Sequence, residues 1–433
     1  MPQNAPRERA ILVGLQWKSR NASGSGSLEQ VGESLDELGE LAATAGAEVV
    51  GRTIQARDAP EAATLIGRGK VEEIAASISA GAAGTVIFDH DLSPTQQRNL
   101  ENALNCKIID RTQLILDIFA SRARTREGRL QVELAQLNYM LPRLTGKGAA
   151  MSRLGGGIGT RGPGETQLET DRRRIARRIK RISNDLENVR TGRALHRRRR
   201  AAVPLATLAL AGYTNAGKST LFNRLTEAGV LADARLFATL DPTVRPLVLP
   251  SRRRVLLSDT VGFIRNLPTT LVKAFRATLE EVNEAALILH VIDASSPAAP
   301  DHAAHVFKVL SEIGASAIPQ LLVLNKIDRL PDGSLDAESM GRRLLSGDAG
   351  AQSRTVAISG LTGTGIDRLL GLIDELLPAD PVRETTLTLD AGDGATLALL
   401  HEFGRVLDVR YDGDSCQVRA QIPQSLEQRL GRR

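Results

Sequence analysis

Cysteine is scarce in this chain, which has only two in 433 residues, Cys106 and Cys416. They lie far apart and beside no metal-ligand motif, so the sequence argues against a disulfide framework and favours buried free thiols. Long apolar runs are also missing. None approaches the roughly 18 residues of a membrane span, and no apolar core of signal-peptide length follows the N-terminus. We therefore expect a cytoplasmic protein with no stable membrane insertion.

Acidic residues are scarce in one segment. Residues 151–200 hold 15 Lys and Arg against five Asp and Glu, although the whole chain has a formal net charge of only +6. A solvated helix face would need more interleaved acidic residues, so this density predicts a polyanionic partner such as nucleic acid. A charged helix face exposed to solvent is the alternative.

One eight-residue run matches G-x-x-x-x-G-K-[ST] at every defined position. It lies between an apolar strand-like stretch, residues 205–210, and a helical pattern, residues 220–225. Glycines let backbone N–H groups point at an anionic phosphate, and the following helix adds its positive dipole. We predict a nucleotide site in which Lys218 reaches the β/γ-phosphates and Ser219 binds magnesium; a glycine-rich turn is the alternative. The run consists of Gly212, Tyr213, Thr214, Asn215, Ala216, Gly217, Lys218 and Ser219.

Three further stretches, each after a strand-like segment, favour guanine. In the first, Asp259 can hold magnesium through water and Gly262 can approach the γ-phosphate. In the second, Asp328 can accept the N1–H and amino protons of guanine; facing adenine it would be left unpaired, at a cost of about 1–3 kcal/mol or more. In the third, a backbone N–H can donate to the guanine oxygen. The stretches are Asp259, Thr260, Val261 and Gly262; Asn325, Lys326, Ile327 and Asp328; and Ser359, Gly360 and Leu361.

This ordered set resembles the Ras-like small-GTPase class of P-loop proteins over residues 203–378. The resemblance implies GTP as substrate and Mg²⁺ as cofactor, held directly by Ser219 and Thr239 and through water by Asp259. Thr243 is the competing ligand candidate, and a surface loop with incidental threonines is the alternative. The implied first switch consists of Phe237, Ala238, Thr239, Leu240 and Asp241.

The glutamine that orients the attacking water in Ras-like enzymes is absent, because the residue after Gly262 is Phe263. A phenyl ring neither donates nor accepts that hydrogen bond, so we expect slow intrinsic hydrolysis and stimulation by a partner. Lys218, Thr239 and Gly262 would assist, but the sequence identifies no general base. Arg265 is near enough to be suspected as an arginine finger, although a solvated surface arginine is the simpler interpretation.

Residues 1–122 alternate strand-like and helix-like segments, which predicts a mainly parallel sheet covered by helices. Ser93 and Pro94 are typical of a helix cap and first turn. Residues 67–70 lack the spacing of a second phosphate loop and favour a turn or helix start. Strands are predicted at 10–13, 48–50, 85–88 and 107–109, and one apolar helical face at Leu28, Val31, Leu35, Leu38 and Leu41.

Two narrow apolar seams follow within residues 123–196. Their steps of four and three predict an antiparallel helical hairpin whose second helix runs roughly 30 Å. An ordinary core-facing helix pair is the alternative. Residues 193–204 are predicted to form the hinge to the next domain. The seams are Leu130, Leu134, Leu137, Leu141 and Leu144, then Leu168, Ile175, Ile179, Ile182, Leu186 and Val189.

The loop between the seams is rich in glycine. Residues 145–164 hold eight glycines, with Lys147, Arg153 and Arg161 between them. Such a segment cannot offset its ordering entropy alone, so on a stiff basic stalk it is predicted to order inside an RNA cavity. A flexible linker is the alternative.

The chain resembles the HflX family of GTPases over about residues 10–425. The resemblance rests on the run of residues 162–171 beside the second seam, on the first switch and on the preceding domain. The resemblance implies a ribosome-associated GTPase that binds the large ribosomal subunit and its rRNA near the peptidyl-transferase centre. It also implies that the protein can split stalled or idle ribosomes. Some members of the family are implied to have an ATP-dependent activity in the first domain, for which this sequence shows no second phosphate loop.

We therefore expect an α/β protein, active as a monomer, and a length of 433 residues suffices for its three domains. They are a parallel-sheet α/β domain with a long antiparallel helical hairpin, a Ras-like P-loop GTPase domain, and a small α+β domain at residues 384–425. The last has strand-like segments at 387–389 and 416–419 and an amphipathic helix at 396–403. Two other functions stay open: an RNA-remodelling ATPase, against which Asp328 argues, and a non-catalytic GTP-dependent ribosome-binding scaffold, which Phe263 allows.

Overall fold

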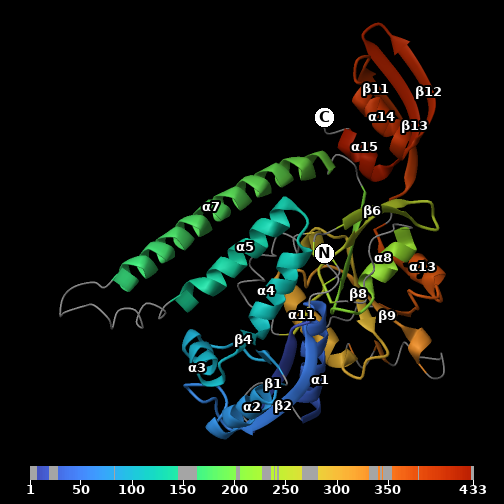
Figure 1. Cartoon of the computed structure of the whole chain (residues 1–433). Coiled ribbons are helices and arrows are strands. Elements are labelled where there is room, and N and C mark those ends of the chain that lie inside the picture. The colour runs from blue at the N-terminus through green and yellow to red at the C-terminus, as the bar shows by residue number, and fades with distance from the viewer. Residues whose placement is uncertain are drawn as a thin grey trace.

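Three β-sheets organise the chain in a computed structural model (Figure 1). A four-stranded sheet comes first, a six-stranded sheet second and a three-stranded sheet last, and a long helical arm projects from between the first two. The structure describes residues 7–18, 28–81, 83–144, 163–200, 205–226, 236–237, 239–240, 243–265, 281–330, 340–341, 344, 354–378 and 380–430.

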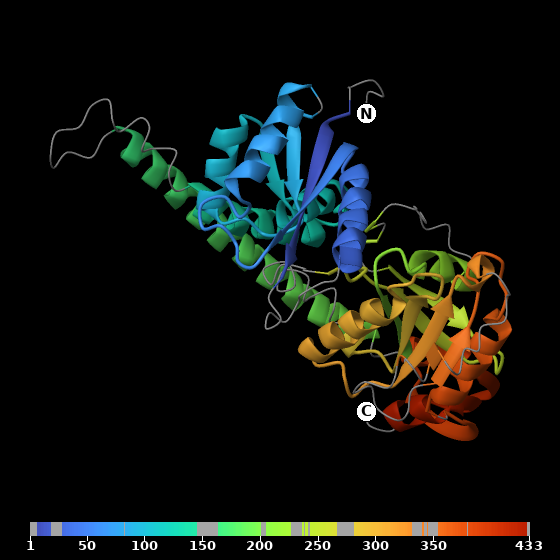
Figure 2. The ribbon, with the colours of Figure 1, turned by 90° about the horizontal axis from the view of Figure 1, so that it is seen from below.

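The first sheet is parallel, with the order β2-β1-β3-β4, and has helices on both faces (Figure 2). Adjacent residues of β1 point to opposite faces: Leu12 packs with α1 and α4, and Val13 packs with α2 and α3. The predicted parallel α/β arrangement is confirmed. The elements are β1 (Arg9–Trp17), α1 (Leu28–Thr44), β2 (Glu48–Arg57), α2 (Arg68–Ser79), β3 (Thr85–Phe88), α3 (Pro94–Leu104), β4 (Lys107–Asp110) and α4 (Arg111–Arg122).

Local sequence signals set the helix starts in this domain. Ser93 and Gln96 form a capping box at the start of α3, with Pro94 in the first turn, as predicted. Residues 67–70 are a helix start, because α2 begins at Arg68 with Gly67 as its cap. The predicted apolar face of α1 is buried from Val31 onwards. Leu28, the first residue of that predicted face, is 62% exposed. The first three residues of α1 are all exposed, so the buried part of the face begins one turn later.

The helical arm consists of α5 (Arg126–Met140), a 3-10 turn (Leu141–Leu144) and α7 (Pro163–Arg200), which lies antiparallel to α5 (Figure 1). The five residues Ile175, Ile179, Ile182, Leu186 and Val189 of the second seam are all buried or half-buried, and the first seam is half-buried throughout. The predicted hairpin is thus confirmed. Residues 145–162, most of the predicted tip loop, lie outside the described residues, as does the side chain of Leu168.

The length predicted for the second helix is wrong. α7 has 38 residues, which corresponds to about 57 Å. It continues to Arg200, so the helix does not break at Arg193, where the predicted hinge began. The end of α7 has few apolar residues, and an apolar seam therefore cannot reveal it. Arginine nevertheless has a high helix propensity, and the helix continues through the arginine-rich end. Residues 201–204 lie outside the described residues.

The second sheet has the order β10-β9-β8-β5-β7-β6, and only β6 is antiparallel to its neighbour. Its central strand β5 is flanked by β8 and β7, so the loop after β5 emerges near the middle of the sheet's carboxyl edge. The elements are β5 (Thr207–Gly212), α8 (Lys218–Thr226), β6 (Thr243–Val248), β7 (Arg254–Asp259), β8 (Leu287–Asp293), α11 (Ala299–Glu312), β9 (Gln320–Asn325), a 3-10 turn (Ile327–Arg329), β10 (Arg354–Ala357) and α13 (Ile366–Leu376).

The third sheet is antiparallel, with the order β11-β13-β12. Two helices pack on it, and Leu400 of α14 and Leu426 of α15 are buried against Val418 and Ile422 of β13. The strand β12 and the helix α15 were not predicted. The elements are β11 (Val382–Asp390), α14 (Gly394–Phe403), β12 (Arg405–Asp412), β13 (Ser415–Pro423) and α15 (Gln424–Leu430).

The first and second sheets belong to domains that share one buried apolar cluster. It runs from α1 and α4 into the loops around the carboxyl edge of the second sheet. At its centre the rings of Phe119, from α4, and Phe237, from the predicted first switch, meet edge to face with centroids 4.5 Å apart. Because aromatic contacts of this kind stabilise an interface beyond simple area burial, the two domains form a packed unit.

Both cysteines are free thiols; Cys416 is buried, as predicted, but Cys106 is only half-buried. Among the described residues no helix carries an apolar stretch long enough to cross a bilayer.

Candidate functional site

The predicted phosphate loop joins the carboxyl end of β5 to the start of α8. Two of its glycines are required by their surroundings. Gly212 has φ +152°, and a Cβ there would lie 2.3 Å from the backbone oxygen of Val291. Gly217 has φ +92°, and its Cβ would lie 2.3 Å from Nδ2 of Asn325. The loop can therefore follow this path only with glycine at both positions.

Lys218, the first residue of α8, is buried. Its ammonium group donates to the backbone oxygens of Gly212, at 3.0 Å, and Tyr213, at 2.7 Å. Burial lowers the pKa of Lys218 to about 8, with Asp259 opposing and Lys326 adding to the shift. A buried ammonium group whose hydrogen bonds go to two backbone carbonyls would be stabilised further by an anionic phosphate placed in the loop.

Three oxygen-bearing side chains meet beside Lys218. The hydroxyl of Ser219 lies 2.9 Å from the hydroxyl of Thr239, and both donate to Oδ2 of Asp259, at 2.9 and 2.7 Å respectively. These are the residues predicted to hold magnesium, brought together from α8, the first switch and the end of β7. Thr243, the competing candidate, lies on β6, and no hydrogen bond joins its hydroxyl to this group in the described part of the chain.

This group of residues fits a magnesium ion by its chemistry. Hydroxyl and carboxylate oxygens are the donors that Mg²⁺ prefers, with the remaining positions filled by water and substrate phosphates. The other carboxylate oxygen of Asp259, Oδ1, is buried and has no hydrogen-bond partner among the described residues. Burial also raises the pKa of Asp259, although Thr239 and Lys218 partly oppose this. An orphaned buried carboxylate oxygen is costly, and a hydrated cation would satisfy it.

The two stretches predicted to recognise guanine meet beside the phosphate loop. Asn325, at the end of β9, donates to the backbone oxygen of Ala216 and accepts from the backbone N–H of Gly360, both at 2.9 Å. Oδ1 of Asp328 accepts from the hydroxyl of Ser359 at 2.5 Å. Asn325 is buried, whereas Asp328 is exposed. The asparagine therefore joins the phosphate loop to the loop of Gly360, and the exposed aspartate is accessible to a ligand.

The other predicted binding residues line or support these loops. Asn215 is exposed, with φ +61°, and Leu361 is 68% exposed. Lys326 has φ +66° and pairs with Asp293 at 2.7 Å. Ala238 and Asp241 lie outside the described residues. The remaining predicted residues are buried, namely Tyr213, Thr214, Ala216, Phe237, Leu240, Thr260, Val261 and Ile327.

Phe263 occupies the position where the sequence lacks a water-orienting glutamine. Its backbone accepts from the N–H of Thr214 at 2.7 Å and donates to the oxygen of Gly212 at 3.1 Å, so it is tied to the phosphate loop. Its side chain is 2% exposed and belongs to the apolar core. The ring thus has a structural role. Arg265 pairs with Asp301, at 3.3 Å, and Glu33, at 4.0 Å, and so is neither freely solvated nor free to act as an arginine finger.

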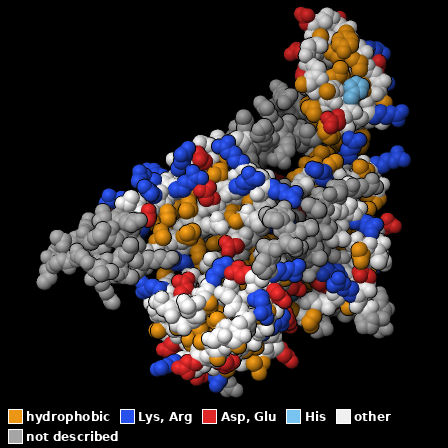
Figure 3. Space-filling view, in the orientation of Figure 1, with side chains coloured by type: hydrophobic (Ala, Val, Ile, Leu, Met, Phe, Trp, Pro, Cys, Tyr) orange, Lys and Arg blue, Asp and Glu red, His pale blue; other side chains and the backbone are white. Residues whose placement is uncertain are grey.

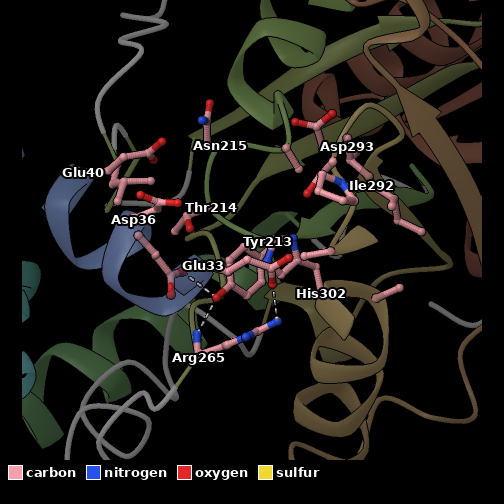
Figure 4. A pocket seen from close by; sticks show the side chains of 18 of the residues that line it. Glu33, Asp36, Glu40, Tyr213, Thr214, Asn215, Arg265, Ile292, Asp293 and His302 are labelled. Carbon is pink, nitrogen blue, oxygen red and sulfur yellow. Dashed lines mark hydrogen bonds and ion pairs between the residues drawn. The ribbon is translucent and has the colours of Figure 1, made fainter. Parts of the chain in front are cut away.

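A cavity of about 290 Å³ separates the phosphate loop from α1 (Figure 4). The acidic side chains of Glu33, Asp36 and Glu40 project from α1 on one side, and Tyr213 and Asn215 lie on the other. Burial raises the pKa of Glu40, and the nearby negative charge of Glu37 raises it further. A negatively charged wall would repel nucleotide phosphates, so this cavity is a poorer place for them than the predicted site beside Lys218.

Glu37 and Phe119 contact the predicted nucleotide-binding loops, Arg111 supports Glu37 from behind, and the sequence revealed none of the three. Oε1 of Glu37 accepts from the hydroxyl of Tyr213 at 2.5 Å, and its other oxygen pairs with Arg111. Arg111 is 1% exposed and also pairs with Asp89 at 2.7 Å. The only signal in the sequence is the charged Arg111 inside a largely apolar stretch, residues 108–119. This pattern does not identify Glu37 or Asp89 as the partners of Arg111.

Family models match three consecutive parts of the chain. A GTP-binding GTPase N-terminal model covers residues 32–120, a GTP-binding GTPase Middle Region model covers 122–200, and a 50S ribosome-binding GTPase model covers 207–326. Together they span the first sheet, the helical arm and most of the second sheet.

Curated relatives named GTPase HflX are similar over most of the chain. The relative from Caldanaerobacter subterraneus subsp. tengcongensis is 46% identical over 438 residues, covering 98% of this chain and 93% of the relative. The relative from Escherichia coli (strain K12) is 48% identical over 362 residues, covering 84% and 83%. A third, from Alkalihalophilus pseudofirmus, is 54% identical over 325 residues, covering 75% of each.

Proposed function

The chain belongs to the HflX family of ribosome-associated GTPases, and from that premise we propose that it binds the large ribosomal subunit and splits stalled or idle ribosomes. GTP hydrolysis follows from the family and from its P-loop domain. The large subunit as the binding partner, and splitting as the outcome, are our proposal. The match of residues 207–326 to the model of 50S ribosome-binding GTPases supports the choice of subunit.

The observation that carries the proposal is the basic arm. Lys and Arg side chains gather along α7 in the space-filling view (Figure 3). Arg173 and Arg178 are paired, with Glu169 and Glu133, whereas Arg172, Arg177 and Arg181 have no carboxylate partner in the part of the chain that the structure describes. A projecting helix with exposed unpaired arginines suits the phosphates of rRNA.

The proposal gives each predicted nucleotide-binding group a role that its position supports. Lys218 and the backbone N–H groups of the phosphate loop would bind the phosphates, and Asp328 would recognise guanine. Ser219 and Thr239 would hold Mg²⁺, with Asp259 acting through water; when bound, the ion neutralises charge that develops on the phosphate oxygens. Because Thr239 belongs to the first switch, its contact would link that switch to the nucleotide state.

Two side chains support the proposal that a partner is needed for fast hydrolysis. Phe263 is buried, and Arg265 is engaged by two carboxylates. Neither side chain is available to orient water or to stabilise the transition state. We therefore expect slow turnover by the isolated protein and a large increase when ribosomal particles order the switches.

The test is single-turnover GTP hydrolysis with and without purified large subunits, together with sedimentation of 70S ribosomes. The proposal expects large subunits to raise the rate and GTP-loaded protein to convert 70S particles into subunits. A fast rate without a partner, or 70S particles that stay intact, would contradict it. Deleting residues 155–162, which lie outside the described part of the chain, should preserve GTP binding and abolish splitting.

A charge variant tests the arm itself. Replacing Arg172, Arg177 and Arg181 with Ala should flatten the log–log salt dependence of large-subunit binding by about two to three, at about 0.7–0.9 per lost phosphate contact. The matched control replaces the exposed Arg383 and Arg405 of the C-terminal domain, which should leave the slope near that of the wild type. An unchanged slope in the arm variant would show that α7 does not bind rRNA phosphates.

A further inference from the structure

A second cavity lies in the first domain, away from the nucleotide site. It has a volume of about 390 Å³ and opens between α3, α4, α5 and the 3-10 turn that follows α5. This volume falls within the range of pockets that hold small organic ligands. The function proposed above uses no residue that lines it.

The cavity offers free hydrogen-bonding groups over an apolar floor. Gln113 of α4 and Gln136 of α5 are half-buried and line it, and within the described structure neither side-chain amide has a hydrogen-bond partner. The floor includes the buried Leu116, and Met140, which is 48% exposed, forms part of the rim. Each amide carries both donors and acceptors. A planar ligand with donors and acceptors along its edge would satisfy them.

One wall of the cavity is held rigid by Arg143. Its guanidinium group lies 3.4 Å from the centroid of the Tyr139 ring and donates to Oε1 of Gln97 at 3.0 Å. It also donates to the backbone oxygen of Leu92, at 2.7 Å, and to Asp110, at 3.0 Å. A wall fixed by this many contacts does not have to be ordered when a ligand binds, which favours affinity.

The charges around the cavity exclude a phosphate group as its main occupant. Asp110 already neutralises Arg143. Among the other lining residues, Glu101 and Asp117 are acidic and only Arg98 is basic. Burial raises the pKa of Asp117, although Lys107 opposes this. Carboxylates accept hydrogen bonds when ionised, so the cavity favours a neutral group that carries N–H donors.

The cavity also lies next to the basic arm. α5 supplies Gln136, Tyr139 and Met140 to it, and one turn earlier on the same helix Glu133 binds Arg178 of α7, at 2.7 and 2.9 Å. A strand whose phosphates follow α7 would therefore have a base within reach of the cavity.

We propose that this cavity accepts an unpaired RNA nucleobase, preferably one with an exocyclic amino group, extruded from an RNA strand that lies along α7. The proposal rests on the proposed function, because that function brings RNA to the arm. Unpaired bases are the part of RNA that proteins read by edge hydrogen bonds and stacking. Adenine, cytosine and guanine have the amino group that Asp117 or Glu101 can accept from; uracil has none.

The experiment uses the full-length protein and short single-stranded RNA oligomers that differ at one central position, which carries adenine, uracil or no base. Wild-type protein should bind the adenine oligomer about tenfold more tightly than the abasic one, as expected for one stacked and hydrogen-bonded base. The uracil oligomer should lie between them. Equal affinities for adenine and abasic oligomers would overturn the proposal.

Two variants separate this inference from the proposed function. Gln113→Leu with Gln136→Leu should remove the preference for adenine while keeping the salt slope and GTP affinity of the wild type. Replacing Arg172, Arg177 and Arg181 with Ala should instead flatten the salt slope and keep the preference for adenine. If the leucine variant keeps the adenine preference, the inference fails while the proposed function stands. If the arginine variant also keeps its salt slope, the proposed function fails as well.

Two competitors test other occupants of the cavity. Adenosine should displace a 2-aminopurine-labelled oligomer from the wild type at millimolar concentration, whereas ATP should do so more weakly because of the carboxylates. Stronger displacement by ATP than by adenosine, lost in the leucine variant, would identify a free nucleotide as the occupant and overturn the proposal. The measurement is made in excess GTP, which keeps ATP from the phosphate loop.

Discussion

The contact between the phosphate loop and the first domain predicts a specific energetic coupling. The hydroxyl of Tyr213 donates to Glu37 at 2.5 Å and accepts from the backbone N–H of Arg265 at 2.8 Å. Burial, and then Glu37, raise the pKa of Tyr213, so the phenol keeps its proton and remains a donor. On its other side Glu37 pairs with Arg111, whose pKa is lowered by burial but raised overall by Glu37 and Asp89.

Removing Glu37 should cost more unfolding free energy than removing the hydroxyl of Tyr213. Tyr213→Phe deletes one hydroxyl and leaves Glu37 paired with Arg111, so we expect a loss of about 1–3 kcal/mol in unfolding free energy. Glu37→Ala leaves a desolvated arginine with a single carboxylate, and we expect about 3–5 kcal/mol. In the double variant the two losses of unfolding free energy should not add, because Glu37→Ala alone already removes the carboxylate that accepts from the Tyr213 hydroxyl. The expected coupling free energy is about 1–3 kcal/mol.

The assay is urea unfolding followed by tryptophan fluorescence. The chain has one tryptophan, Trp17, which lies at the end of β1 and meets His90 edge to face at 5.9 Å, so the signal reports the first domain. Asp36→Ala is the matched control. Asp36 is one position away on α1 and pairs with Arg52 at the surface, so its cost should stay within about 1 kcal/mol. Additive losses for Tyr213→Phe and Glu37→Ala would refute the reasoning.

Three other predictions concern the second domain. Asp328→Asn should weaken GTP binding and admit xanthosine triphosphate, whose added carbonyl an amide can face; unchanged base preference in a competition titration would contradict this. Gly217→Ala should abolish GTP binding in calorimetry while the chain stays folded, because its Cβ would meet Asn325. Burial lowers the pKa of His290 to about 3, so the unfolded chain binds more protons between about pH 3 and 6.5. Stability should therefore fall on acidification through this window, by about 2 kcal/mol at pH 5, and His290→Leu should reduce that slope in urea titrations.

Patterns confined to one element predicted much of the fold. A Ser-Pro pair with Gln three residues after the serine is sufficient for the capping box at Ser93, because every partner lies within one turn. The seam of Ile175 to Val189 likewise fixes which side of α7 meets α5. The full length of α7 could not be predicted from the seam, because its last turns lack the apolar periodicity by which a seam reveals a helix.

The phosphate and base loops were predictable for a related reason: their spacing is dictated by a ligand of fixed shape. The contact between Glu37 and Tyr213 has no such template, since it joins residues 176 positions apart. Its energy also depends on Arg111, which is buried between the carboxylates of Glu37 and Asp89 by the packing of the first domain. A buried cation of this kind is costly unless both carboxylates are in place. The arrangement of α1, α4 and the phosphate loop therefore depends on this charge group as well as on the apolar cluster around it.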